Sequence, residues 1–344
     1  METILALAVV ESDGTLGKPG LEAVTAAQEM ARQMGQAALV IGLIGDNPQP
    51  AANQLAHCGA ARFLAAAGPD FAVARYGTDA AAAEALARAA AATVVVAPGT
   101  ARVNRFLPGV AHRLQGRADT HVTGLVSVEG KTAVTRWYYR QRMEAVLHRA
   151  ARPWLIAVDP GCFAPWNGPA GQAALENVPL TVDDQLRRTR VLGVQEPAAD
   201  AQTIRPEAGL LFVTGAGWTK KQADGQTHVK EAEIIILDFL KHTRASLGSS
   251  KSLVDLSGEG QQVLSFLTHL NQIGQTGSTP RHPKGLATCC HGEEPHAVGW
   301  RFISERRAVN LDPNCGWARG KADVLYVADA FAVMRKVNEL LAAS

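Results

Sequence analysis

Four loops in the second half of the chain carry residue types that suit a phosphate-bearing ligand. They are residues 215–217 (Gly-Ala-Gly), 248–251 (Gly-Ser-Ser-Lys), 274–277 (Gly-Gln-Thr-Gly) and 289–292 (Cys-Cys-His-Gly). Glycine lets the backbone approach a phosphate closely, so that the following N–H groups face the anion. The Ser and Thr hydroxyls add hydrogen-bond donors, and Lys251 adds a positive charge. Together the loops favour a nucleotide or dinucleotide, although a single Gly-x-Gly is typical of an ordinary turn.

The strands and helices around these loops must position them. In the second half we expect a buried strand at 210–214, helices at 229–243 and 261–270, a late strand at 324–327 and a closing helix at 330–341. This alternation of strand and helix is typical of a parallel sheet covered by helices. Ligands of such open sheets bind in the crevice at the carboxyl ends of the strands.

The first half also alternates short apolar runs with alanine-rich stretches. Its expected strands are 4–10, 37–43 and 93–97, and its expected helices are 22–34 and 78–91, with Thr78 and Asp79 in capping position. Strand-like runs at 119–128, 131–139 and 143–148 predict an antiparallel meander, which the apolar strand 153–158 closes. Residues 171–184 look irregular. The first half is therefore expected to be a mixed α/β domain.

The chain has 344 residues, which suits two domains better than one. Residues 196–206 are polar, alanine-rich and bounded by prolines, as is typical of a linker. We therefore predict an N-terminal domain at 1–195, a linker at 196–206 and a C-terminal domain at 207–344.

The bulk composition excludes several function classes. A formal net charge of +2 offers no electrostatic footprint for nucleic acid or for an anionic membrane. The first apolar run, residues 4–10, is too short to span a bilayer and lacks the basic flank and cleavage site of a signal peptide. The five cysteines are odd in number and form no Cys-x-x-Cys, so a disulfide framework is not expected. These features favour a bacterial cytoplasmic protein that is not membrane-embedded.

An ordered set of motifs across most of the chain resembles the alpha subunits of electron transfer flavoproteins, the FixB type. In the first domain the matching segments are Val10-Glu11, residues 108–114, residues 120–128 and residues 160–163 (Pro-Gly-Cys-Phe). In the second domain they are residues 248–255, the full Gly-Gln-Thr-Gly at 274–277, the spacing to Gly292 and His296, residues 309–313 and residues 327–329. The chain thus looks like a divergent subfamily of these subunits.

The resemblance implies an α/β fold with an N-terminal mixed domain that forms the subunit interface. It also implies a C-terminal parallel-sheet domain (DHS-like) that binds FAD, with no catalytic residue and no metal. Lys251 would lie near the isoalloxazine, Gln275 and Thr276 near the flavin and ribityl chain, and His296 at the pyrimidine end. The full set of implied cofactor contacts is Gly217, Ser250, Lys251, Gln275, Thr276, Gly277, His291, Gly292, His296, Asn310 and Asp329. Ser250 would lie at the pyrophosphate, and Asn310 and Asp329 at the adenosine end.

The resemblance further implies a heterodimer with an electron transfer flavoprotein beta subunit. Such a heterodimer accepts electrons from a donor dehydrogenase and passes them to a quinone oxidoreductase or a similar acceptor. It carries electrons and transforms no substrate of its own. The linker at 196–206 would serve as the hinge for a swing of the second domain.

The chain departs from the family pattern at the phosphate end of the expected site. Ala216 and Lys251 stand where the family has Arg, and His291 stands where it has Ser; Lys220 or Lys221 could supply a replacement charge. These departures leave two alternatives open. One is a flavin-free scaffold of the same fold, and the other is a nucleotide-dependent enzyme. The enzyme would be metal-assisted, with candidate ligands Cys290, His291, His296 and Cys315.

Overall fold

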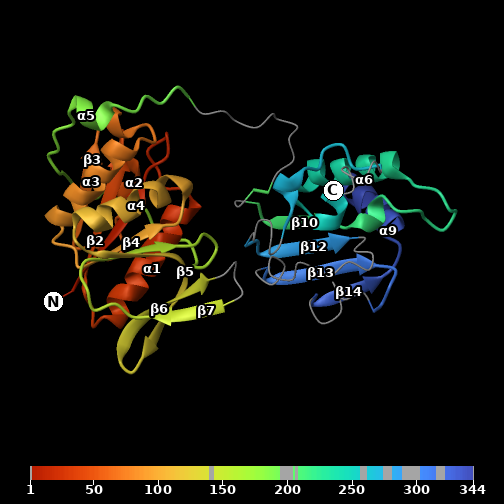
Figure 1. Cartoon of the computed structure of the whole chain (residues 1–344), viewed down its shortest axis with the longest axis horizontal. Coiled ribbons are helices and arrows are strands. Elements are labelled where there is room, and N and C mark those ends of the chain that lie inside the picture. The colour runs from red at the N-terminus through yellow and green to blue at the C-terminus, as the bar shows by residue number, and fades with distance from the viewer. Residues whose placement is uncertain are drawn as a thin grey trace. The chain divides into compact units, whose positions relative to one another are not determined.

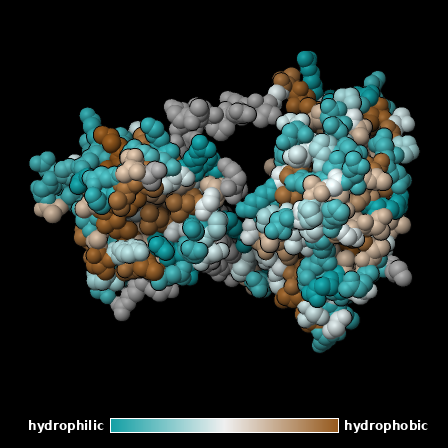
Figure 2. Space-filling view, turned by 180° about the vertical axis from the view of Figure 1, so that it is seen from behind, coloured by the Kyte–Doolittle hydropathy of each residue, from teal (hydrophilic) through white to brown (hydrophobic). Residues whose placement is uncertain are grey.

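The computed structural model describes residues 2–138, 143–193, 204–205, 208–255, 262–273, 281–288, 303–314 and 322–343. The chain divides into two compact units, Met1–Val194 and Gln195–Ser344, and each is α/β (Figure 1). Apolar side chains reach the surface of both units among hydrophilic ones (Figure 2). In the described part of the chain, no helix has the length and apolar character needed to cross a membrane.

The first unit is built on a nine-stranded sheet with the order β7-β6-β5-β8-β4-β1-β2-β3-β9. Its strands are β1 Thr3–Val9, β2 Ala38–Gly45, β3 Arg62–Ala67, β4 Val94–Pro98, β5 Arg117–Val128, β6 Lys131–Tyr138, β7 Met143–Leu147, β8 Trp154–Val158 and β9 Leu175–Asn177. The central strands pair in parallel. They are apolar and almost continuously buried, as a sheet covered on both faces requires.

Helices cover both faces of this sheet. They are α1 Lys18–Gln33, α2 Gln49–Gln54, α3 Tyr76–Ala89, α4 Ala101–Arg113 and the short α5 Asp184–Arg187, together with the 3₁₀ turn η1 Pro69–Phe71. Residues of α1 and α2 belong to one core cluster, and residues of α3 and α4 belong to the other. The alanines of α3 bury a whole face because small side chains let the helix lie close to the sheet.

Three expectations for the first unit need correction. The helix predicted from residue 78 begins at Tyr76, and Thr78 and Asp79 are buried within it, so neither is the N-cap. Asp79 instead forms an ion pair with Arg102 of α4. The meander β5-β6-β7 is antiparallel as predicted, but β8 lies between β5 and β4 and is parallel to both. The segment 171–184 contains the short strand β9, which extends the sheet beyond β3.

The second unit is a five-stranded parallel sheet with the order β11-β10-β12-β13-β14. Its strands are β10 Leu210–Thr214, β11 Ser246–Ser249, β12 Lys284–Thr288, β13 Glu305–Asn310 and β14 Val324–Val327. Its helices are α6 Val229–Thr243, α7 Lys251–Asp255 and α9 Ala330–Ala342, with the 3₁₀ turns η2 Ala216–Trp218 and η4 His269–Asn271. The chain direction across the sheet reverses at β10, which is where ligands of open α/β sheets bind.

Two apolar clusters hold the second unit together. Side chains of α6 and α9 pack with Phe212, Leu247 and Val309, and a smaller cluster includes Leu211 and Val213. The strands predicted at 210–214 and 324–327 and the helix predicted at 229–243 are confirmed with the same bounds.

The helix predicted at 261–270 is wrong in its described part, because residues 262–273 contain the 3₁₀ turn η4 and no α-helix. Thr268 and Asn271 form a reciprocal capping box there, and the buried Asn271 amide donates to the carbonyl of Leu247 at 3.2 Å. These side-chain bonds hold the segment against β11 in a conformation that its apolar spacing does not reveal.

A candidate ligand-binding cleft in the second unit

A cleft of about 320 Å³ opens in the second unit beside the carboxyl ends of its strands. The arrowheads in Figure 1 mark this edge of the sheet. The segments that line the cleft follow β10, β13 and β14. The lining residues are Gly217, Lys220, Lys221, Gln222, Ala223, Asn310, Leu311, Asp329 and Ala330. Because the strands are parallel, segments far apart in sequence meet at this one edge.

The glycine turn after β10 forms one wall of the cleft. The Gly215 N–H donates to the carbonyl of Thr288 at 2.9 Å, which ties the turn to the end of β12. Trp218 is fully buried, and its ring centroid lies 4.6 Å from that of Phe331 in α9. Ala216 is also buried, so this position contributes a small side chain to the core and no charge to the cleft.

Lys220 and Lys221 are exposed at the cleft and are presented by an ordered loop. The Gln222 side-chain amide donates to the carbonyls of Gly217 and Lys220, at 3.0 and 2.7 Å. The Gln222 N–H donates to the Gln226 carbonyl at 2.8 Å. Neither lysine forms an ion pair with a carboxylate in the described part of the chain. Their charges are therefore available to an anionic ligand.

Asn310 and Asp329 form the opposite wall. Asn310 is the last residue of β13, as the motif at 309–313 predicts, and it is 5 % exposed. Its side-chain oxygen accepts a hydrogen bond from the Asp312 N–H at 3.2 Å. Asp329 caps α9, because one of its carboxylate oxygens accepts the Phe331 N–H at 3.0 Å. The Asp329 side chain otherwise lies exposed at the cleft.

Ser250 lies apart from this lining. Its N–H donates to the carbonyl of Thr214 at 2.9 Å, and its hydroxyl accepts the Leu253 N–H at 3.3 Å, so it caps α7. Gly248 and Ser249, expected in a loop, belong instead to β11. Lys251 begins α7, and its side chain lies outside the described part of the structure.

The cleft thus brings together Gly217, Asn310 and Asp329 of the predicted cofactor contacts. Six others lie outside the described residues: Gln275, Thr276, Gly277, His291, Gly292 and His296. The candidate metal ligands Cys290 and Cys315 do as well. Within the described residues, no group of three or more His, Cys, Asp and Glu side chains is placed to hold a metal ion.

Sequence reasoning missed four lining residues: Gln222, Ala223, Leu311 and Ala330. None of them has a motif of its own, and only their adjacency in sequence to Lys221, Asn310 or Asp329 would have pointed to them. The lining residues include no Ser, Cys or His. Two cations, one carboxylate and two amides suit the binding of a polar, partly anionic ligand, and no nucleophile with a partner base is among these lining residues.

Comparison with protein-family models matches residues 5–183 to the electron transfer flavoprotein domain. The match covers just over half of the chain and lies within the first unit. A search of curated proteins finds no match.

Proposed function

The chain belongs to the electron transfer flavoprotein family, and from this membership we propose that it is an alpha-type subunit that carries FAD in its second unit. The family match ends at residue 183, before the second unit, so the cofactor proposal rests on the cleft. The observation that carries it is the convergence of Gly217, Asn310 and Asp329 on that cleft. The sequence resemblance implies a cofactor contact for each of these three residues.

The residues of the cleft fit the adenosine and pyrophosphate part of FAD. A carboxylate beside a glycine turn is the usual partner of ribose hydroxyls, which is the role we assign to Asp329. Asn310 places a buried side-chain amide at the cleft, at the end of β13. Lys220 and Lys221 supply the positive charge that Ala216 lacks. When bound, FAD supplies reversible uptake and release of electrons, and these residues bind and orient it.

The remaining assignments are parts of the same proposal. Ser250, Lys251, Gln275, Thr276, Gly277, His291, Gly292 and His296 would surround the rest of the cofactor. The partner subunit is an electron transfer flavoprotein beta subunit. A donor dehydrogenase supplies electrons to the heterodimer, and a quinone oxidoreductase accepts them. The proposed location is the cytoplasm of a bacterium.

The test is to purify the chain with its beta-type partner, record the absorbance spectrum and extract the cofactor. We expect a yellow heterodimer that releases FAD. Asp329→Asn keeps the helix cap, because Asn caps about as well as Asp, but removes the charge. We expect it to weaken FAD binding by about tenfold, since a hydrogen bond to a charged group contributes about 1.5–3 kcal/mol.

Asp323→Asn is the matched control. Asp323 precedes β14, the strand that Asp329 follows, and it pairs with Arg306; neither residue lines the cleft. We expect FAD affinity in this variant to equal that of the wild type. A heterodimer that stays colourless in excess FAD would contradict the flavin assignment and support the flavin-free scaffold. Equal losses of FAD affinity in Asp329→Asn and Asp323→Asn would show that Asp329 does not contact the cofactor.

A further inference from the structure

A segment of the first unit, residues 178–189, crosses from the edge of the sheet to the start of α3; we call it the strap. It begins at Val178, whose N–H donates to the carbonyl of Ala65 at 2.8 Å. Leu180 and Val182 then pack, half-buried, against the apolar cluster beneath α3 and α4. The short helix α5 follows, capped by Asp183 through the Leu186 N–H at 2.9 Å.

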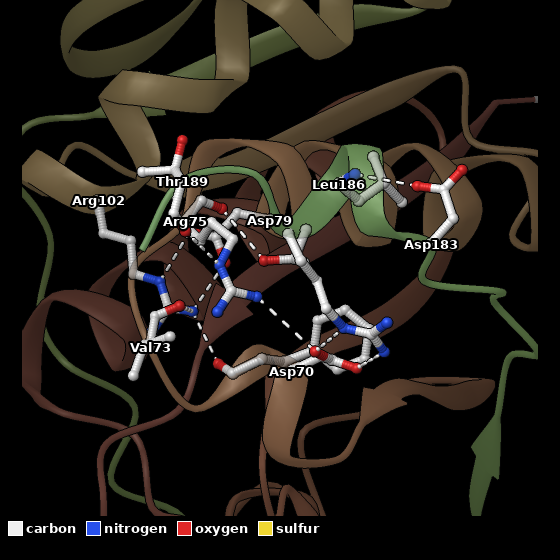
Figure 3. Close-up of polar contacts among 11 residues, drawn as sticks. Asp70, Val73, Arg75, Asp79, Arg102, Asp183, Leu186 and Thr189 are labelled. Atoms are coloured by element: carbon white, nitrogen blue, oxygen red, sulfur yellow. Dashed lines mark hydrogen bonds and ion pairs between the residues drawn. The ribbon is translucent and has the colours of Figure 1, made fainter. Parts of the chain in front are cut away.

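Ion pairs and hydrogen bonds at the surface hold the C-terminal end of the strap. Arg187 donates to both carboxylate oxygens of Asp70, at 2.7 and 2.6 Å. Arg75 lies 3.7 Å from the same carboxylate, and its Nε donates to the carbonyl of Thr189 at 3.0 Å (Figure 3). Asp70 of η1 thus pairs with Arg187 of the strap and with Arg75 before α3, and Arg75 also bonds the strap directly through Thr189.

The strap packs closely against α3 at Gly77. An added Cβ at Gly77 would lie 2.5 Å from the carbonyl oxygen of Leu186, so only glycine permits this approach. Between residues 67–71 and Leu180, Val182 and Arg187 of the strap, however, lies an open surface pocket of about 190 Å³. The strap is therefore incompletely packed here, and the Arg187–Asp70 ion pair is partly exposed, where ion pairs contribute little to stability.

The segment just before the strap, strand β9, is held by backbone pairing with β3. Strand β9 pairs with β3 through the register Phe63↔Leu175, Leu64↔Glu176 and Ala65↔Asn177. Strand pairing is cooperative with the rest of the sheet, whereas the strap depends on a few side chains and one shared carboxylate. The strap can therefore open without the sheet, and Val178 is where the opening would stop.

We propose that the strap is a releasable clasp that sets the length of chain between the two units. On the far side, Ile204 packs on the second unit and the Arg205 N–H bonds the Ser246 hydroxyl. With the strap closed, about 15 residues separate Thr189 from Ile204 and span at most about 50 Å. With it open, about 26 residues separate Val178 from Ile204 and span at most about 90 Å.

Release would lower the effective concentration of one unit at the other, because that concentration falls as the connecting chain lengthens. The clasp thus sets how far the second unit can reach from the first. It requires only two units joined by this segment, so it does not rest on the proposed function.

Asp70→Asn in the full chain tests the clasp, because it removes one charge and weakens both arginine contacts. Arg188 remains as a trypsin site within the strap. We expect cleavage at this site and amide exchange over residues 179–189 to rise by about tenfold. Arg187→Gln should act in the same way, and the double variant should exceed neither single variant by much, since both changes break one contact.

Glu176→Gln is the matched control. Glu176 accepts two hydrogen bonds from Arg62, at 3.0 and 2.9 Å, but lies in β9 before the strap. It should leave strap cleavage and exchange unchanged. Small-angle X-ray scattering supplies the second readout: Asp70→Asn should broaden the distance distribution of the whole chain, and Glu176→Gln should not.

Three results would overturn the proposal. The first is unchanged cleavage and exchange in Asp70→Asn and Arg187→Gln. The second is faster cleavage with unchanged scattering, which would show that the strap opens without changing the reach between the units. The third is an equal rise in exchange in strands β1, β2 and β4, which would make Asp70 a general stabilising residue of the first unit.

Discussion

The indole Nε1 of Trp218 donates a hydrogen bond of 2.9 Å to the hydroxyl of Thr288, at the end of the neighbouring strand β12. The same hydroxyl donates to the carbonyl of Val213 at 3.1 Å, so one side chain joins β10, β12 and the glycine turn. Trp218 also packs on Phe331, two residues after the cap Asp329. Trp218 thereby fixes the distance between the two walls of the cleft without lining it.

Replacing Trp218 with Phe tests this positioning role. The variant loses the hydrogen bond and part of the ring volume, so we expect the free energy of unfolding to fall by about 1–2 kcal/mol. We also expect weaker FAD binding, because the glycine turn then keeps only the backbone bond from Gly215 to Thr288. Denaturant unfolding and FAD titration measure the two effects. Lower stability with unchanged FAD affinity would show that Trp218 is only a core residue.

Gly248→Ala tests the packing between β11 and Ile273. An added Cβ would lie 2.9 Å from Cγ2 of Ile273 and 3.3 Å from Cδ1 of Leu211. Overpacking of this kind costs about 1–3 kcal/mol, which outweighs the entropic gain of replacing a glycine in a strand. Gly209→Ala is the control, because no atom lies within 4 Å of its added Cβ. Thermal unfolding should show a lower midpoint for Gly248→Ala alone.

Asp119→Asn tests the buried ion cluster of the first unit. The Asp119 carboxylate accepts two hydrogen bonds of 2.8 Å from Arg149, one of 3.2 Å from Arg136 and one of 2.8 Å from the indole of Trp154. Breaking a fully buried pair costs about 3–5 kcal/mol, and because Arg149 reaches solvent we expect a loss of about 2–3 kcal/mol. Glu144→Gln, at an exposed position of β7, should change stability by less than about 0.5 kcal/mol.

The same carboxylate predicts a pH dependence. Burial alone would raise the pKa of Asp119, but hydrogen bonds from Arg149 and Trp154 and the charges of Arg149 and Arg136 outweigh it, so the pKa is lowered. A lowered folded-state pKa means that the stabilisation is present above the unfolded value of about 3.9 and is lost as the pH falls through the folded value. The difference in unfolding free energy between wild type and Asp119→Asn should therefore be constant near neutral pH and shrink below about pH 4. A difference that stays constant at acid pH would contradict this account.

Local patterns in the sequence predicted the elements whose neighbours are close in the chain. The helix at 229–243 places Ala232, Ile236 and Leu240 on one face, and the strand at 210–214 is a short run of apolar residues bounded by glycines. The strands β12 and β13 were not predicted from composition, because Lys284, Arg306 and Arg307 break their apolar character. Their place in the sheet comes from pairing with β10 and with each other.

Residue type and local spacing in the sequence predicted the α/β class and a two-part organisation, and the resemblance to a family implied Gly217, Asn310 and Asp329 as candidate contacts. Only the tertiary structure decided that these three residues share one cleft with Lys220 and Lys221. Parallel pairing brings the end of β10 to the same edge of the sheet as the ends of β13 and β14, which lie about 90 residues or more further along the chain. The tertiary structure also decided that Asp70 holds a segment more than a hundred positions away. Such contacts follow from chain topology and the packing of side chains, which no local pattern contains.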